Sequence, residues 1–167
     1  FIGQLMVQLA SRQAPGRLVV SEPHPSKRAR ALELGAHQTV DPSQQSVDEL
    51  IDMLDGGADV VIECVGRTDT METAVRVARK GGQVLLFGVA APGDTIPVSP
   101  FEIFRKELAI RGSFINPNTH AAAIALAAQG IVKLSPLVSH RWTLQDVPDM
   151  MRRYPALGVS KGLIVMD

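Results

Sequence analysis

Apolar positions along the chain alternate between the spacing of a helix and the short continuous runs of a buried strand. Residues 5–10 have helical spacing, Pro15 and Gly16 end that element, and residues 18–20 form an apolar run typical of a strand. The same alternation repeats as far as residue 88. Because parallel strands need helix-length connections that cover the sheet, the pattern predicts an α/β fold with a parallel sheet.

Polar residues and glycines mark where several of these elements begin and end. Ser46 and Glu49 form an S-x-x-E capping box, which predicts the start of a helix. Asp69 and Glu72 are expected to cap the next helix, which should end at the glycine pair 81–82. The apolar run 83–88 then predicts another buried strand.

The last third of the chain has a different pattern. We expect one more strand within 107–115, an alanine-rich helix within 119–130 and a terminal strand within 161–166. Thr143 and Asp146 form a second candidate capping box. From about residue 134 onwards, the segments are typical of a separate layer attached to the α/β domain.

Composition and charge exclude several classes of protein. The chain has 167 residues, with 17 basic and 17 acidic side chains, so no net charge favours nucleic acid or an anionic membrane as a partner. No segment has the ~20 apolar residues needed to cross a bilayer. The single cysteine, Cys64, excludes an intrachain disulfide and a multi-cysteine zinc site, which favours a cytoplasmic location.

One glycine and one acidic residue point to dinucleotide binding. In the G-x-G-x-x-G turn, glycines let the backbone approach a pyrophosphate at a helix N-terminus, and an acidic residue about 20 positions later binds the ribose. Gly3 stands directly before the first helical pattern, and Glu22 lies 19 positions later at the end of a predicted strand. The pair is weak evidence alone, and the alternating strands and helices around it strengthen it.

Four segments in order carry a wider resemblance: FIGQLMVQLA, ECVGRTDTMETAVRVARKGGQVLLFGV, ELAIRGSFINP and VSKGLIVMD. Together they resemble the second half of the zinc-dependent medium-chain dehydrogenases, the alcohol, sorbitol and threonine dehydrogenase superfamily. The resemblance implies a Rossmann-type, doubly wound parallel sheet without its first strand, followed by segments of the GroES-like substrate domain. We expect the dinucleotide-binding domain at 1–133 and the return into the substrate domain at 134–167. The chain is accordingly expected to be a fragment of a longer enzyme.

The resemblance also assigns cofactor contacts to individual residues. Gly3 matches the last glycine of the fingerprint, Glu22 the acid that binds the adenosine ribose and Lys161 a basic residue that reaches a phosphate. Ser113 and Ile115 match backbone positions that bind the nicotinamide carboxamide. The full set of expected cofactor-binding residues is Ile2, Gly3, Glu22, Lys27, Cys64, Val65, Gly66, Arg67, Phe87, Gly88, Ser113, Ile115 and Lys161. No catalytic or metal-binding residue is expected in this chain.

The activity that the resemblance implies is hydride transfer between a secondary alcohol or polyol and NAD. The carboxylate of Glu22 would repel a 2′-phosphate and so favours NAD over NADP, although the nearby residues His24, Lys27, Arg28 and Arg30 weaken that argument. Zinc would act as a Lewis acid in the complete enzyme, with ligands outside this chain. The fragment alone is expected to be inactive.

Other interpretations stay open at this point. A zinc-free quinone or enone reductase of the same superfamily would use NADPH, and Glu22 argues against it. A non-catalytic dinucleotide-binding domain is a further alternative, because the chain carries no evident catalytic side chain. Taken without their surroundings, Gly3 and Glu22 could be an ordinary helix start and a solvated strand end, and Cys64 is more typical of a small buried residue than of a ligand.

A homodimer or homotetramer is also expected. The segment Thr95 to Val98 has the pattern of a short apolar strand, and in the resembling family the corresponding edge pairs with its twin. A proline or a charge at Ile96 should then produce monomers.

Overall fold

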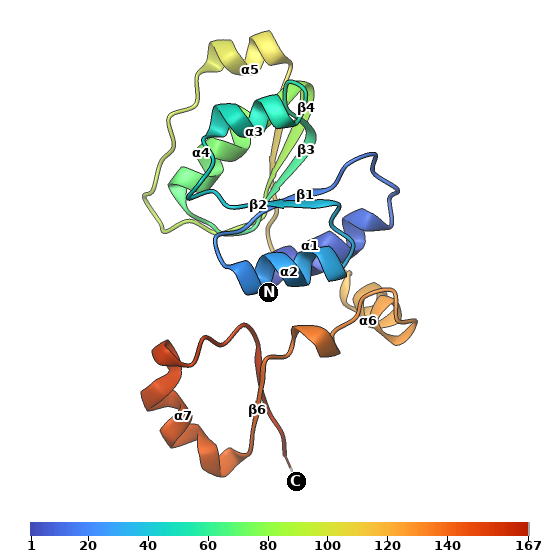
Figure 1. The fold of residues 1–167 in the computed structure, drawn as a ribbon, viewed down its shortest axis with the longest axis vertical. Helices are drawn as coiled ribbons and strands as arrows, with labels where there is room; N and C mark the ends of the chain where they lie inside the picture. The colour runs from blue at the N-terminus through green and yellow to red at the C-terminus, as the bar shows by residue number, and fades with distance from the viewer. Residues whose placement is uncertain (167) are drawn as a thin grey trace. The chain divides into compact units, whose positions relative to one another are not determined.

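A computed structural model describes residues 1–166 of the chain, except for the side chain of Pro155. The chain forms two compact units, Arg17–Pro117 on the one hand and Phe1–Gly16 with Asn118–Asp167 on the other. Figure 1 colours both units by residue number.

The unit Arg17–Pro117 consists of parallel strands and the helices that connect them. Its strands are β1 (Val19–Ser21), β2 (Gln38–Val40), β3 (Ala58–Glu63), β4 (Ala78–Leu86) and β5 (Ala109–Gly112). Its helices are α2 (Pro25–Glu33), α3 (Val47–Met53), α4 (Thr68–Val77) and α5 (Pro100–Lys106). β1 pairs with β2, and β4 pairs with both β3 and β5; every pairing is parallel.

This topology confirms the predicted α/β fold of the Rossmann type. A doubly wound dinucleotide-binding sheet has the strand order 3-2-1-4-5-6. The pair β2–β1 corresponds to the order 3-2, and the triplet β3–β4–β5 corresponds to 4-5-6. Within residues 1–166, strand 1 of that order has no counterpart.

Local sequence explains where several helices of this unit begin. The Ser46 side chain accepts from the Glu49 backbone, and the Glu49 carboxylate accepts from the Ser46 backbone, which confirms the predicted capping box of α3. α5 begins with Pro100 directly after Ser99, whose hydroxyl accepts a hydrogen bond from the Glu102 backbone. These contacts satisfy backbone N–H groups that have no partner within the helix.

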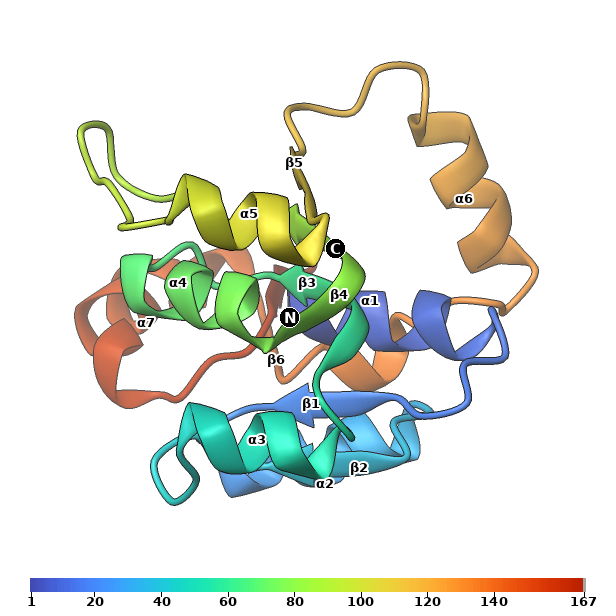
Figure 2. The same ribbon diagram turned by 90° about the horizontal axis from the view of Figure 1, so that it is seen from above.

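The core of this unit lies between α4 and the triplet sheet. The inward face of α4 contributes Ala74 and Val75, which pack with Ala78 and Val84 of β4. α4 contacts β3 and β4, and α5 contacts β4, as Figure 2 shows. α2 lies against β1 and β2. Burial of these aliphatic side chains fixes the carboxyl ends of β3, β4 and β5 relative to one another.

The other unit combines the first helix with the end of the chain. Its helices are α1 (Ile2–Ser11), α6 (His120–Ala128) and α7 (Val147–Arg153), its 3₁₀ turns η1 (Ser135–Leu137), η2 (Leu144–Asp146) and η3 (Tyr154–Ala156), and its strands β6 (His140–Trp142) and β7 (Gly162–Ile164). β6 and β7 pair in parallel. Thr143 and Asp146 form the predicted capping box, at the start of η2.

The boundary between α4 and β4 differs from the prediction. The glycine pair 81–82 was expected to end the helix, but α4 ends at Val77 and β4 already begins at Ala78, which pairs with Ala58 of β3. Ala78 is fully buried in the core, so its burial in an extended conformation outweighs the continuing helical pattern. The predicted cap by Asp69 and Glu72 forms only in part: α4 begins at Thr68 with Arg67 as its N-cap residue, and Asp69 lies in the first turn, where its carboxylate accepts a hydrogen bond from the Thr70 backbone nitrogen.

The segment Thr95–Val98 is not a strand within the described chain. Ile96 and Val98 pack against the core, whereas Thr95 and Pro97 are exposed. The inward and outward alternation of a strand is therefore present, but no strand of residues 1–166 pairs with this segment. The prediction of a strand at Thr95–Val98 is therefore wrong within this chain, where the segment packs on the core without strand pairing. Its pairing with a second copy stays a prediction.

Candidate functional site

The carboxyl ends of β3, β4 and β5 bring three predicted cofactor segments to one edge of a sheet. Glu63 of β3, Leu86 of β4 and Gly112 of β5 lie in register across the three strands. The residues that follow them are Cys64, Val65, Gly66 and Arg67 after β3, Phe87 and Gly88 after β4, and Ser113 and Ile115 after β5. Because ligands of open α/β sheets bind outside the carboxyl ends of the strands, this edge is the candidate dinucleotide site.

Two glycines let the first two of these loops touch through their backbones. A Cβ atom on Gly88 would lie 2.2 Å from the Gly66 nitrogen, and one on Gly66 would lie 2.5 Å from the Val89 carbonyl oxygen. Gly66 also has a φ of 85°, in the left-handed region that favours glycine. A side chain at either position would force the loops apart, so the close approach depends on both glycines.

A buried acid, Glu63, lies beneath these loops and was missed by the sequence analysis. Its carboxylate accepts hydrogen bonds from the backbone nitrogens of Val65 (2.7 Å) and Gly66 (2.9 Å) and from the Thr70 hydroxyl (2.8 Å). The indication in the sequence was a single charged residue at the end of an otherwise apolar run, because a buried charge needs several hydrogen-bond donors nearby.

Cys64 follows Glu63 and is a poor nucleophile or ligand in this environment. Burial raises the pKa of the Cys64 thiol to about 11, and the Glu63 carboxylate adds to the rise. The thiol is therefore protonated at neutral pH, as expected of a small partly buried side chain. Its contribution to the site lies in its backbone and its volume.

Arg67 points into solvent and is already engaged. Its guanidinium donates two hydrogen bonds to the Asp69 carboxylate, at 2.9 and 2.7 Å. This pair lowers the pKa of the Asp69 carboxyl, chiefly through the hydrogen bonds from Arg67. Both side chains are more than half exposed, so a ligand phosphate can compete for the guanidinium at low cost.

The segment after β5 carries backbone strain at a predicted contact residue. The Ser113 nitrogen donates to the Leu86 carbonyl at 3.3 Å and so continues the sheet by one residue. Ile115 has a φ of 58°, which is unfavourable for a β-branched side chain, and its side chain is exposed. Strained residues of this kind cluster at ligand sites, and Ile115 was assigned to the nicotinamide carboxamide.

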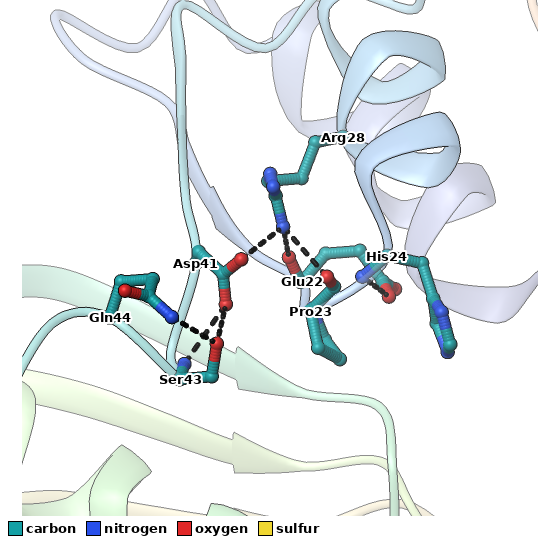
Figure 3. A network of polar contacts seen from close by, with 7 residues as sticks. All are labelled: Glu22, Pro23, His24, Arg28, Asp41, Ser43 and Gln44. Atoms are coloured by element: carbon teal, nitrogen blue, oxygen red, sulfur yellow. Dashed lines mark hydrogen bonds and ion pairs between the residues drawn. The ribbon is translucent and has the colours of Figure 1, made fainter.

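Glu22 lies at the carboxyl end of β1, in the polar network that Figure 3 shows. Its backbone nitrogen donates to the Val40 carbonyl, and its carboxylate accepts from the backbone nitrogen of His24 at 3.0 Å. Arg28 donates to the carbonyl oxygens of Glu22 and Pro23, both at 2.8 Å. The backbone that carries the Glu22 carboxylate is thereby held from the first turns of α2.

Arg28 also pairs with an acid at the end of the neighbouring strand. The distance between Arg28 Nη1 and Asp41 Oδ2 is 2.9 Å, and both side chains are largely shielded. The Ser43 hydroxyl and nitrogen donate to Asp41, and with Arg28 they lower the pKa of the Asp41 carboxyl. Lys27, the other predicted basic contact, lies in the first turn of α2, and within residues 1–166 its ammonium forms no hydrogen bond or ion pair.

The other unit places Lys161 beside the start of α1. Ile2 and Gly3 are the first two residues of α1, where backbone N–H groups have no partner in the helix. The Lys161 ammonium lies 5.1 Å from the ring centroid of Phe1, the N-cap residue of the same helix. Phe1 and Lys161 line a cavity of about 380 Å³ together with Trp142, Met150, Tyr154, Ser160, Gly162 and Ile164.

Free helical N–H groups and a nearby ammonium are the components of an anion site. The structure thus brings Lys161 close to the residue that precedes Ile2 and Gly3, all within the unit Phe1–Gly16 with Asn118–Asp167. The resemblance predicts that Gly3, with Ile2 before it, and Lys161 lie at the cofactor phosphates.

The described residues provide neither a cluster of metal ligands nor a helix able to cross a membrane. Residues 1–166 contain no group of three or more His, Cys, Asp or Glu side chains able to hold a metal ion. Their donor set does not fit zinc. In the same part of the chain, every helix is too short or too polar to span a membrane.

Comparison with known proteins connects this geometry to one family. Residues 2–129 match the family described as zinc-binding dehydrogenase. The chain is 30% identical over 153 residues to S-(hydroxymethyl)glutathione dehydrogenase of Aspergillus oryzae, a match that covers 87% of this chain and 40% of that protein. It is 28% identical over 148 residues to human sorbitol dehydrogenase, covering 86% of this chain and 41% of that protein.

A solved structure is similar over almost the whole chain. It is a candidate zinc-binding dehydrogenase of Sinorhizobium meliloti 1021 bound to NADP, with a TM-score of 0.92 and 38% identity. The match covers 98% of this chain and 49% of that one. The chain therefore spans less than half the length of the proteins that it matches.

Proposed function

Because this chain belongs to the zinc-binding dehydrogenase family, we propose that it forms the dinucleotide-binding part of an enzyme that transfers hydride between a secondary alcohol or polyol and NAD. The observation that carries the proposal is the sheet edge at β3, β4 and β5, where three predicted cofactor segments meet in register. A nicotinamide cofactor supplies the hydride chemistry, and the protein supplies binding and orientation.

The chain's own residues take distinct parts in binding. The backbones of Val65, Gly66 and Gly88 would face the adenosine half of the cofactor, and the two glycines let the loops that carry them touch. Ser113 and Ile115 present backbone groups to the nicotinamide carboxamide, and the start of α1 with Lys161 binds phosphate oxygens.

The remaining predicted contacts complete the proposed site. They are Ile2, Gly3, Glu22, Lys27, Cys64, Arg67 and Phe87. We retain residues 1–133 as the proposed dinucleotide-binding domain and 134–167 as the proposed return into a substrate domain. Because the described residues do not fit zinc, we assign no metal-dependent step to them.

The Glu22 carboxylate supports NAD as the cofactor. Its hydrogen bond from the His24 nitrogen fixes it at the end of β1, where an acid binds the ribose hydroxyls and repels a 2′-phosphate. The Arg28 guanidinium is neutralised by Asp41, so it weakens this repulsion less than an unpaired cation would.

NADP is the second candidate, because the similar protein of Sinorhizobium meliloti was solved bound to NADP. The half-buried Lys27 ammonium at the start of α2 supports this alternative. A zinc-free reductase of the same superfamily that uses NADPH is one enzyme that such a cofactor preference would allow. A non-catalytic dinucleotide-binding domain would bind a cofactor without turnover.

Parallel titration with NADH and NADPH tests the proposal. The protein from the complete gene, followed by nicotinamide fluorescence, should bind NADH more tightly than NADPH and oxidise a polyol or secondary alcohol. Glu22→Gln should lower the ratio of NADH affinity to NADPH affinity by about tenfold, the size of one lost unit-charge interaction near a surface. Glu33→Gln in α2 should leave this ratio unchanged. Tighter binding of NADPH by the unmodified protein would contradict the choice of NAD, and binding without turnover would favour the non-catalytic alternative.

We also propose that the protein forms a homodimer and that it is located in the cytoplasm. The support for the homodimer is the segment Thr95–Val98, whose inward residues pack on the core while Thr95 and Pro97 are exposed. Because Ile96 is a core residue, Thr95→Pro is a cleaner test than a substitution at Ile96. Monomers of Thr95→Pro in sedimentation, with an unchanged circular dichroism spectrum, would agree with pairing through this segment, and intact dimers would contradict it.

A further inference from the structure

Glu63 is the one buried acidic residue of the described chain, with only 5% of its surface exposed. Burying a carboxylate is costly unless several donors bind it. All donors to this carboxylate are neutral groups: two backbone nitrogens and a hydroxyl, at 2.7–2.9 Å. The group is thus kept in the core by hydrogen bonds to a loop rather than by a partner cation.

The same residue binds a second loop through its backbone. The Glu63 carbonyl accepts hydrogen bonds from the nitrogens of both Phe87 and Gly88, at 2.9 Å each. A Cβ atom on Gly88 would lie 2.5 Å from Glu63 Oε2, so the carboxylate occupies the space directly below that turn. Glu63 therefore contacts the loop after β3 with its side chain and the turn after β4 with its carbonyl.

Gly66 is bound by both oxygens of the carboxylate. Its nitrogen lies 2.9 Å from Oε1 and 3.2 Å from Oε2. The Thr70 hydroxyl, which donates to Oε1 at 2.8 Å, also lies 2.9 Å from the carbonyl oxygen of Arg67, the N-cap residue of α4, so its one proton is shared between these two acceptors. The carboxylate thus holds the loop at its middle and, through Thr70, at the start of α4.

We propose that Glu63 is a positioning residue that fixes the spacing between the loop Cys64–Arg67 and the turn Phe87–Gly88, and through it the affinity for the dinucleotide. The inference rests on the proposed function, because it treats these two loops as cofactor contacts. Glu63 itself touches no ligand. Its effect passes through backbone groups whose placement a ligand requires to within a fraction of an ångström.

Glu63→Gln tests the inference with a side chain of the same size. The remaining oxygen can keep the contacts of Oε1, but the amide nitrogen takes the place of Oε2, where it faces the Gly66 nitrogen at 3.2 Å as donor against donor. The hydrogen bonds that remain also lose the negative charge that strengthens them. We expect the Kd for NADH to rise by about tenfold or more, because misplaced contacts weaken binding, while kcat at saturating cofactor changes by less than about twofold. Glu72→Gln is the matched control, because Glu72 lies on α4 and its side chain has no hydrogen bond within residues 1–166. The Kd of this variant for NADH should equal that of the unmodified protein.

Backbone exchange separates this inference from the proposed function. In the protein from the complete gene, Glu63→Gln should speed hydrogen exchange at the nitrogens of Val65 and Gly66 without any cofactor present. Faster exchange with an unchanged Kd would overturn the link to affinity, and unchanged exchange would overturn the positioning role. If the unmodified protein binds neither NADH nor NADPH, the proposed function fails, while the exchange experiment still decides whether Glu63 positions the loop.

A second variant covers the possibility that Glu63→Gln does not fold. Thr70→Val removes one of the three donors and keeps the carboxylate bound to Val65 and Gly66. It should raise the Kd for NADH in the same direction by a smaller factor, about twofold to fivefold, with kcat unchanged. An unchanged Kd in Thr70→Val would count against the inference.

Discussion

Gln8 and Lys133 exchange two hydrogen bonds although 125 positions separate them in the sequence. The Gln8 amide oxygen accepts from the Lys133 nitrogen at 2.7 Å, and its amide nitrogen donates to the Lys133 carbonyl at 3.2 Å. Gln8 is buried in α1, so this pair anchors the first helix to the segment that follows α6. A side-chain amide carries a donor and an acceptor, so it can satisfy the N–H and the C=O of one backbone residue together.

Gln8→Ala should therefore destabilise the unit that contains α1. The substitution removes both partners of the Lys133 backbone, and because Lys133 is exposed and water can replace the amide, the expected cost is about 0.5–1.5 kcal/mol. Urea unfolding followed by circular dichroism measures the loss. Gln13→Ala, at an exposed position after α1, should change the free energy of unfolding by less than about 0.5 kcal/mol. Equal stability of the two variants would show that the Gln8 amide contributes nothing.

Gly88→Ala should separate the two loops at the proposed cofactor site. The new methyl group would lie 2.2 Å from the Gly66 nitrogen and 2.5 Å from Oε2 of the buried Glu63, and these two groups are hydrogen-bonded to each other, so neither can move away freely. We expect a loss of about 1–3 kcal/mol in the free energy of unfolding, typical of overpacking, together with weaker NADH binding. Gly112→Ala is the control for stability, because a Cβ atom at this strand end meets open space. A stable Gly88→Ala protein with normal NADH binding would contradict the close approach of the loops.

Much of the fold follows from local residues and simple periodicity. The capping boxes at Ser46 and Thr143 form as predicted, because each needs only residues three positions apart. The parallel sheet follows from buried apolar runs separated by helices, and it brings the ends of β3, β4 and β5 together. The candidate site at that edge could thus be located from sequence, although its cofactor contacts stay predictions.

The features that sequence could not supply depend on distant partners. α4 ends at Val77 because Ala78 pairs with Ala58 and is buried, which no local pattern around the glycine pair indicates. Glu63 is a local exception, because its donors lie only two to seven positions later; the charged residue at the end of an apolar run was the indication, but sequence does not show that the loop after β3 folds back over the carboxylate. The segment Thr95–Val98 has the alternation of a strand, but strand formation needs a neighbouring edge that residues 1–166 do not place there.

Cys64 should react slowly with alkylating reagents until the solution is strongly alkaline. Its pKa of about 11 leaves only about one molecule in a thousand as thiolate at pH 8, because the thiolate is the reactive form. The rate of iodoacetamide labelling, measured by mass spectrometry of the peptide that contains Cys64, should rise tenfold per pH unit up to that value. The urea-unfolded protein is the control and should level off near pH 8.5. A plateau near pH 8.5 in the folded protein would contradict the burial of the thiol.

The same thiol makes a prediction about stability. Its pKa is higher in the folded than in the unfolded chain, so the unfolded chain loses its proton first as the pH rises. The contribution of Cys64 to stability is complete below about pH 8.5 and is lost between there and about pH 11. Cys64→Ala should lack this alkaline decline, and an identical decline in both proteins would assign it to other groups.

Asp41→Asn should weaken the connection between β1 and β2 near Glu22. The substitution removes the partner of the half-buried Arg28 guanidinium, which also holds the carbonyl oxygens of Glu22 and Pro23. Since hydrogen bonds from Ser43 and the charge of Arg28 lower the pKa of the Asp41 carboxyl, this acid stabilises the fold above the ordinary aspartate pKa of about 3.9. That stabilisation is lost as the pH falls through the lowered pKa, because the unfolded chain takes up the proton first. The Asp41→Asn protein should therefore unfold at a lower urea concentration at pH 7. Below pH 4 it should lose less additional stability than the unmodified protein.

Asp52→Asn is the control, because Asp52 lies at an exposed position of α3 and its side chain forms no hydrogen bond or ion pair within residues 1–166. This variant should behave like the unmodified protein at both pH values. If Asp41→Asn and Asp52→Asn have the same urea midpoint at pH 7, the Arg28–Asp41 pair does not hold the strand ends together.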